Sequence, residues 1–272
     1  MRKGWLENKR VVIIGGTTGI GLSAAKACLE EGATVVVVGR DPNHCHKAGK
    51  ELGTGALALV GDAVMETTAL RAIEASVKHF EGFDALYHIA GGSGRKFGDG
   101  PMHEMTAEGW EKTINWNLGS LMLSNKAALQ YFMRNKKPGN ILNMASVLGI
   151  SPSPRYFSTH AYAAAKSAVI GLSKSMASYY AMYNIRINVI APSLVKTPMS
   201  QRAMDDDEIM QFIATKQPLD GGRTACPEDL DGAAVFLLSD KAAFITGQVI
   251  LVDGGWSVSE GQYPEDTGQS KS

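Results

Sequence analysis

The sequence predicts a doubly wound α/β fold, in which a parallel sheet of seven strands carries helices on both faces. Short β-branched, apolar runs alternate with longer helical patterns along most of the chain. The run from Val35 to Val38 is apolar throughout, as expected of a strand that is buried on both faces. Strands that alternate with helices pair in parallel through right-handed crossovers, so this order favours a single layered sheet.

Each element follows from its local pattern. The first helix is expected to end at Gly32, and the second to begin with Asp41 as its N-cap and Pro42 in its first turn. The expected helices cover residues 19–31, a stretch from about 42, and residues 67–80, 108–134, 160–183 and 228–238. The expected strands cover residues 10–14, 34–38, 56–60, 85–89, 140–144, 185–190 and 248–252.

The domain organisation is expected to be simple. Residues 1–257 contain no linker and no internal repeat, which predicts one domain with a core that needs no disulfide or metal. Residues 193–223 are long for a connection and contain the acidic run 205–208, so we expect a loop-and-helix lid over the site. Residues 258–272 are polar and are expected to form a tail.

Composition excludes several classes of protein. Lys plus Arg and Asp plus Glu number 27 each, which argues against a nucleic-acid or membrane-surface partner. Three widely spaced cysteines fit free thiols in a reducing compartment. The charged start has no apolar leader and no apolar run is long enough to span a bilayer, so a cytoplasmic protein is expected. His44, Cys45 and His46 are adjacent and lack structural-zinc spacing, so no metal site is predicted.

A glycine-rich turn, IIGGTTGIG, follows the first expected strand and opens the first helix. It places glycines at 15, 16, 19 and 21. Glycine permits a tight turn and a close backbone approach to a pyrophosphate, whose charge then faces the helix N-terminus. The spacing differs from the common dinucleotide fingerprint, and a plain strand-to-helix turn would look similar.

The end of the second strand, VVVVGRDP, bears on cofactor choice. An NAD-selective enzyme commonly places a carboxylate there for the ribose 2′-hydroxyl. This chain has Gly39 followed by Arg40, whose guanidinium suits a 2′-phosphate. Asp41 is better interpreted as a helix cap, so NADP(H) is predicted in preference to NAD(H). Asp62, after the third strand, either meets the adenine edge or caps a turn.

Tyr162 and Lys166 lie four residues apart in HAYAAAKSA and therefore on one face of the expected helix. An ammonium beside a phenol lowers the pKa of the phenol, which would suit it to act as a general acid or base. Taken alone, a tyrosine and a lysine at this spacing are more often surface residues of an amphipathic helix.

Read together, these motifs resemble the short-chain dehydrogenase/reductase family, and the match covers roughly residues 6–257. The family's glycine pattern matches Gly15, Gly19 and Gly21, and its Tyr-x₃-Lys pair matches Tyr162 and Lys166. Its serine at the end of a strand matches Ser146, and its helix asparagine matches Asn117. The later segments NVIAPSLVKTPM and ITGQVILVDGG also match, the first by Ile190, Pro192 and Thr197.

The resemblance implies a Rossmann-type oxidoreductase for a ketone and its secondary alcohol. Tyr162 would protonate the carbonyl oxygen and Ser146 would polarise it. Lys166 would lower the tyrosine pKa and hold the nicotinamide ribose, while Asn117 would anchor a relay water. A small-molecule substrate and a homodimer or homotetramer are also implied. The implied cofactor contacts are Gly15, Thr18, Gly19, Ile20, Gly21, Arg40, Asp62, Ala63, Ala90, Gly91, Tyr162, Lys166, Pro192, Val195 and Thr197.

The chain departs from the family pattern at several positions. Ile14 stands where threonine is frequent, and HIAGG at 88–92 replaces Asn-Asn-Ala-Gly, so the usual polar link between those strands is expected to be missing. Ser193 replaces a frequent glycine. The interval between Ser146 and Tyr162 is lengthened by residues within 151–160, which should reshape the substrate pocket. Tyr156, within that insertion, has His160 rather than lysine four residues on, so Tyr162 is the better candidate.

Three cations, Arg95, Lys96 and Arg155, are expected near the substrate mouth. They would suit an anionic substrate, but solvated loop charge is the favoured interpretation. A nucleotide-sensing protein without turnover is a different function class, against which the complete catalytic set argues. A nucleotide-sugar epimerase would need a larger C-terminal substrate domain.

Overall fold

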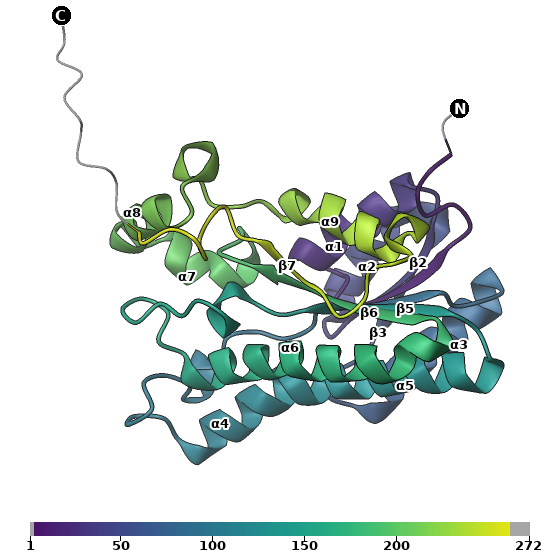
Figure 1. Ribbon diagram of the computed structural model, residues 1–272, viewed down its shortest axis with the longest axis horizontal. Helices are drawn as coiled ribbons and strands as arrows, with labels where there is room; N and C mark the ends of the chain where they lie inside the picture. Colours follow the sequence, from purple (N-terminus) through teal and green to yellow (C-terminus); the bar gives the residue numbers. More distant parts are fainter. Residues whose placement is uncertain (1–2, 262–272) are drawn as a thin grey trace, which may run out of the picture.

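A seven-stranded, wholly parallel sheet forms the centre of the protein in the computed structural model, which describes residues 3–261 (Figure 1). The strand order is β3-β2-β1-β4-β5-β6-β7, the doubly wound arrangement that the sequence predicts. The strands are β1 (Arg10–Ile14), β2 (Thr34–Gly39), β3 (Ala56–Val60), β4 (Ala85–His88), β5 (Gly139–Met144), β6 (Ile185–Pro192) and β7 (Val249–Val252).

Helices cover both faces of this sheet. In Figure 1, α1, α2 and α9 lie on one side of the strands, and α4, α5 and α6 lie on the other; α3 packs beside α5. The segment after β6 adds α7 and α8. The helices are α1 (Gly19–Glu30), α2 (Pro42–Leu52), α3 (Glu66–Phe80), α4 (Ala107–Ile114), α5 (Ser120–Asn135), α6 (His160–Tyr180), α7 (Gln201–Met204), α8 (Asp207–Lys216) and α9 (Asp231–Leu238).

Strand β1 shows how the sequence builds two cores. Successive side chains of a strand point to opposite faces. Val11 and Ile13 therefore join the cluster under α1 and α9, while Val12 and Ile14 join the cluster under α3 and α5. All four are at most 1% exposed. Because both faces are covered, the apolar run is continuous rather than alternating.

The expected helix at 108–134 is interrupted. Residues Asn115–Gly119 form a π-helical turn that joins α4 to α5, and such turns often occur at functional sites. The sequence pattern did not reveal this interruption.

Two features place the site. Strands β1 and β4 are neighbours, although β2 and β3 lie between them in sequence. The chain thus reverses direction across the sheet there, and ligands of such folds bind beyond the carboxyl ends of the strands at that point. Within residues 3–261 no helix is both long and apolar enough to cross a bilayer. Most of the expected polar tail, residues 262–272, lies outside the described residues.

Candidate active site

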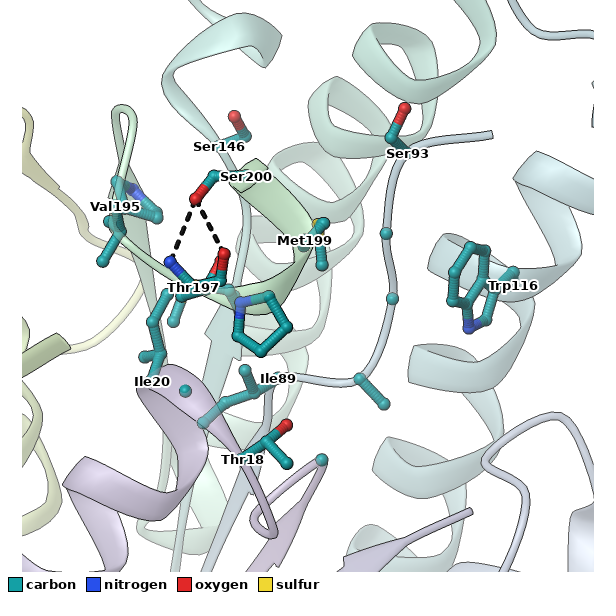
Figure 2. Close-up of a pocket in the computed structure, with 18 of the residues that line it drawn as sticks. Thr18, Ile20, Ile89, Ser93, Trp116, Ser146, Val195, Thr197, Met199 and Ser200 are labelled. Carbon is teal, nitrogen blue, oxygen red and sulfur yellow. Dashed lines mark hydrogen bonds between the residues drawn. The ribbon is translucent and has the colours of Figure 1, made fainter. Parts of the chain in front are cut away.

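A cavity of about 860 Å³ opens at the carboxyl ends of the strands. Figure 2 shows Thr18 and Ile20 at one end and Ser146 at the other, with Met199 between them and Trp116 to one side. Every residue expected to hold the cofactor lines this cavity except Gly21. The lining residues among them are Gly15, Thr18, Gly19, Ile20, Arg40, Asp62, Ala63, Ala90, Gly91, Tyr162, Lys166, Pro192, Val195 and Thr197.

The glycine-rich turn brings backbone close to backbone. Gly15 has a φ of +92°, and a Cβ there would lie 2.7 Å from the amide nitrogen of Ala90. Gly21 lies behind the turn, where a Cβ would collide with the carbonyl oxygen of Gly15. Helix α1 begins at Gly19, and Thr18 places no side-chain cap on its amides. This uncapped helix N-terminus fits a pyrophosphate.

The end of β2 has no room for a carboxylate. A Cβ at Gly39 would collide with the hydroxyl oxygen of Thr17. The Asp41 carboxylate instead accepts hydrogen bonds from the amides of Asn43 and His44, at 2.7 and 3.1 Å. These bonds lower its pKa. The cap role expected for Asp41 is confirmed.

Arg40 lies over the ring of Trp116, a contact that the sequence analysis did not predict. Its guanidinium carbon lies 5.0 Å from the centroid of the Trp116 ring, and the Lys96 ammonium lies 5.3 Å from the same ring. All three line the cavity. Two cations on one indole form a surface that suits an anionic group such as a 2′-phosphate. The only feature of the sequence that could have pointed to Trp116 is its position next to Asn117.

The structure shows one of the two interpretations of Asp62 that the sequence left open, the turn cap. Asp62 lines the cavity near Ala63, and one of its carboxylate oxygens accepts a hydrogen bond from the Val64 amide at 3.3 Å. It therefore caps a turn and also lines the cavity; a contact with the adenine edge remains a prediction.

Ser146, Tyr162 and Lys166 meet at the other end of the cavity. Ser146 follows β5, and the other two lie one turn apart on α6. The Lys166 ammonium lies 5.5 Å from the Tyr162 ring centroid and donates a hydrogen bond to the Met144 carbonyl at 3.0 Å. The end of β5 thus holds the serine, while the first turns of α6 hold the tyrosine and the lysine.

The electrostatics of this group differ from the expectation in one respect. Burial raises the pKa of Tyr162, and a hydrogen bond with Ser146 only partly opposes the rise. The expected lowering by Lys166 is not found. Burial lowers the pKa of Lys166 itself to about 8, because a buried ammonium loses hydration. Without cofactor, the tyrosine is therefore a protonated phenol at neutral pH.

Asn117 lies behind the cavity rather than on its surface, and it is fully buried. Its amide nitrogen donates to the carbonyls of Gly92 and Thr113, both at 2.9 Å, and its amide oxygen accepts from the Gly92 amide at 3.0 Å. Asn117 thus ties the π-helical turn to the backbone that follows β4. Its side chain has little capacity left for the relay water that the resemblance implies.

Asp99 is a second residue that sequence reasoning missed. It is 5% exposed, and its two carboxylate oxygens accept hydrogen bonds from the amides of Ala161 and Tyr162, both at 3.0 Å. A carboxylate at a helix N-terminus is stabilised by the helix dipole. Asp99 therefore fixes the turn of α6 that carries Tyr162. Nothing local in GDGP signals this long-range contact.

His88 makes a polar link of its own where the family's usual strand-to-strand link is missing. It is 1% exposed; its Nδ1 lies 2.7 Å from the Ser124 hydroxyl and its Nε2 lies 3.1 Å from the Ala90 carbonyl oxygen. Burial lowers the pKa of His88 to about 3, with a smaller effect from the charge of Lys166. A neutral ring with Nε2 protonated satisfies both contacts. The link to Ile14 is absent, as expected, but His88 bonds to α5 instead.

The insertion at 151–160 packs against the segment after β6 and against the residues after β7. Phe157 and Thr159 line the cavity, and the Phe157 ring lies 5.8 Å from that of Trp256. Tyr156 packs on Phe212 at 5.1 Å and donates a hydrogen bond to Glu208. Tyr156 therefore faces α8 and does not line the cavity, in keeping with the preference for Tyr162.

The three cations expected near the substrate mouth separate in the structure. Lys96 lies with Arg40 on Trp116. Arg155 pairs with Glu208 on the surface. Arg95 also lines the cavity but is not part of the Trp116 cluster. A further arginine that the sequence analysis did not select, Arg202 of α7, lines the cavity as well.

Relatives with known names share most of this chain. The model of a protein family described as enoyl-(acyl carrier protein) reductase matches residues 15–257. A 2-(S)-hydroxypropyl-CoM dehydrogenase from Xanthobacter autotrophicus is 34% identical, covering 92% of this chain and 97% of the relative. A 3-oxoacyl-[acyl-carrier-protein] reductase from Chlamydia trachomatis is 33% identical, covering 93% and 98%. An inactive 2-(S)-hydroxypropyl-CoM dehydrogenase from Xanthobacter autotrophicus is 35% identical, covering 85% and 98%.

Solved structures of other proteins have the same fold as this chain. A short-chain type dehydrogenase/reductase from Mycobacterium ulcerans superposes with a TM-score of 0.85 at 30% identity, covering 93% of this chain and 91% of that one. A 3-ketoacyl-(acyl-carrier-protein) reductase from Brucella melitensis, complexed with NADH, gives 0.81 at 28% identity, covering 93% and 100%. With the glycine turn and the Ser146–Tyr162–Lys166 group in one cavity, these matches show that the chain belongs to the short-chain dehydrogenase/reductase family of oxidoreductases.

Proposed function

We propose that this protein interconverts a ketone and a secondary alcohol with NADP(H). The observation that carries the proposal is one cavity with two ends. An uncapped helix N-terminus and a glycine turn lie at one end, and Ser146, Tyr162 and Lys166 lie at the other. The first end suits a dinucleotide and the second suits a polarised carbonyl.

The roles of the three side chains follow from their protonation. The bound nicotinamide supplies the hydride chemistry. Tyr162, held as a protonated phenol by burial, donates its proton from Oη to the carbonyl oxygen in the reduction direction. Ser146 donates a second hydrogen bond to that oxygen. The Lys166 ammonium then faces the phenolate that remains, and opposite charges nearby stabilise each other.

Asn117 and Asp99 act on this group through the backbone. Asn117 fixes the Gly91–Gly92 segment beneath the proposed nicotinamide site. Asp99 fixes the first turn of α6. We include residues 193–223 as a lid, because Thr197, Met199 and Arg202 of this segment line the cavity.

The preference for NADP(H) is supported by the exclusion of a carboxylate at Gly39 and by Arg40 and Lys96 on Trp116. NAD(H) is the second candidate cofactor, since the Brucella reductase was solved with NADH. A cofactor-binding protein without turnover is the second candidate function, since one relative carries the name inactive; the complete Ser146–Tyr162–Lys166 group favours catalysis.

A homodimer or homotetramer is also proposed. Large apolar side chains lie exposed along α5 and α6 and around β7, which is typical of an interface. They are Met122, Met133, Tyr179 and Met182 on the helices or just after them, and Phe244 and Ile250 at the sheet edge. A cytoplasmic location is supported by the free thiols Cys28, Cys45 and Cys226.

Substitution of Tyr162 tests the function. Tyr162→Phe is expected to lower kcat for ketone reduction by about a hundredfold or more, the usual contribution of a general acid. NADPH affinity should stay nearly unchanged. Loss of NADPH absorbance reports turnover, and protein fluorescence reports binding. Tyr156→Phe is the matched control, because its hydroxyl contacts Glu208 outside the cavity. Near-normal turnover in Tyr162→Phe would contradict the assignment.

A further inference from the structure

Two arginines from distant segments converge at the substrate end of the cavity. Arg95 follows β4 and Arg202 lies on α7. Both guanidinium groups approach the carbonyl oxygen of Tyr156, at 3.0 and 3.4 Å. Figure 2 shows Ser93 and Ser200, each two residues before one of these arginines, toward the end of the cavity that holds Ser146.

Neither arginine has a carboxylate within salt-bridge distance among the described residues 3–261, and the charge of Asp99 acts on Arg95 only from farther away. Asp99 is the nearby acid, but both of its oxygens accept backbone hydrogen bonds. Burial lowers the pKa of Arg95, and the charge of Arg202 lowers it further. Two like charges therefore adjoin each other, with Arg95 partly buried and Arg202 exposed.

The hydrogen bonds that they do make leave most of their donors unused. In the described chain each guanidinium donates one side-chain hydrogen bond, to the shared carbonyl of Tyr156. A guanidinium presents a fork of N–H donors that matches the oxygens of a carboxylate or phosphoryl group. The remaining donors belong to residues that line the same cavity as Ser146 and Tyr162.

We propose that Arg95 and Arg202 bind an anionic oxygen group of the substrate, so that the preferred ketones carry a carboxylate or a phosphoryl-type group. This inference rests on the proposed function and names its substrate class. Binding of the anion would offset the repulsion between the two guanidiniums and fix the reach of the substrate toward Tyr162. The favoured interpretation of Arg95 as solvated loop charge is replaced by this assignment; Arg155 keeps that interpretation.

Binding to the protein loaded with NADP⁺ tests this inference without turnover, because a ketone and an oxidised cofactor form a dead-end complex. Calorimetry would compare levulinate with its methyl ester, and acetonylphosphonate with its dimethyl ester. We expect levulinate or acetonylphosphonate to bind about tenfold more tightly than its own ester, a difference of about 1.4 kcal/mol in binding free energy. Equal affinity of acid and ester in both pairs would overturn the inference.

Substitutions locate the effect. Arg202→Gln is expected to reduce the acid-to-ester affinity ratio about tenfold, the contribution typical of a charge-assisted hydrogen bond. Arg202→Lys keeps the charge and should retain more of the ratio than Arg202→Gln. Arg155→Gln is the matched control, because Arg155 is exposed and pairs with Glu208 outside the cavity. An unchanged ratio in Arg202→Gln and Arg95→Gln would refute the site.

Turnover of the same compounds with NADPH separates the two proposals. Reduction of the esters without preference for the acids would leave the proposed function standing and remove the anion site. Binding of the acids through the arginines without reduction of any ketone would keep the anion site and contradict the proposed function.

Discussion

Replacement of His88 by asparagine is expected to remove a pH-dependent loss of stability. His88 is 1% exposed, and burial lowers its pKa from 6.5 to about 3, with a smaller effect from Lys166. A depressed histidine pKa means that the unfolded chain binds a proton that the folded chain refuses. Stability is therefore full above pH 6.5 and is lost as the pH falls from 6.5 toward 3.

The magnitude follows from the pKa of the unfolded chain. At pH 5 the folded His88 is still neutral, whereas this pH is about 1.5 units below the pKa of the imidazole in the unfolded chain. At about 1.36 kcal/mol per unit, His88 should cost about 2 kcal/mol between pH 8 and pH 5. Asparagine does not titrate, yet its amide can still donate toward the Ala90 carbonyl and accept from Ser124.

Urea unfolding at pH 8 and pH 5, at a fixed protein concentration, measures this cost. The free energy of unfolding of the wild type should fall by about 2 kcal/mol more than that of His88→Asn. Burial raises the pKa of Asp231 to about 6, which changes stability in the opposite sense over this range but equally in both proteins. The exposed His103 provides the control His103→Asn. The same loss in the wild type and in His88→Asn would refute the reasoning.

Two further substitutions test the cofactor end and the catalytic helix. Arg40→Ala should weaken NADPH binding about tenfold more than NADH binding, because only NADPH carries the 2′-phosphate; equal losses in fluorescence titrations would count against this role. Asp99→Asn should destabilise the protein by about 1–2 kcal/mol and lower kcat, because an amide can accept from only one of the two α6 amides. Thermal unfolding and kcat report it. Asp206→Asn, an N-cap of α8, is the control, since asparagine caps as well as aspartate. Unchanged unfolding and kcat in Asp99→Asn would contradict the positioning role.

The fold was predictable because its signals are local. Apolar runs, helix caps and glycine turns each act within a few residues, and the strands at 10–14 and 56–60 have the expected bounds. The π-helical turn at 115–119 was not predictable, since it depends on the bonds of Asn117 to Gly92 and Thr113. The apolar periodicity of the sequence continues across residues 115–119 and therefore predicts an uninterrupted helix there.

The site was predictable where side chains share a short motif or follow a strand. The spacing of Tyr162 and Lys166 on one helix and the position of Ser146 after a strand brought them together. Asp99 and Arg202 were missed because each acts on a residue far away in sequence. The pKa of Tyr162 could not be anticipated either, because spacing conveys the neighbouring charge but not the depth of burial.

The aromatic contacts that the insertion makes with α8 and with Trp256 after β7 have a consequence for redesign. Tyr156 packs on Phe212, and Phe157 packs on Trp256, whereas Ser146 is held by the end of β5. A graft of a foreign 151–159 loop alone would strip the cover from Phe212 and Trp256 and leave aromatic surface facing water. The loop, the α7–α8 segment and the residues around Trp256 after β7 therefore have to be exchanged together, whereas the strand end that holds Ser146 can stay.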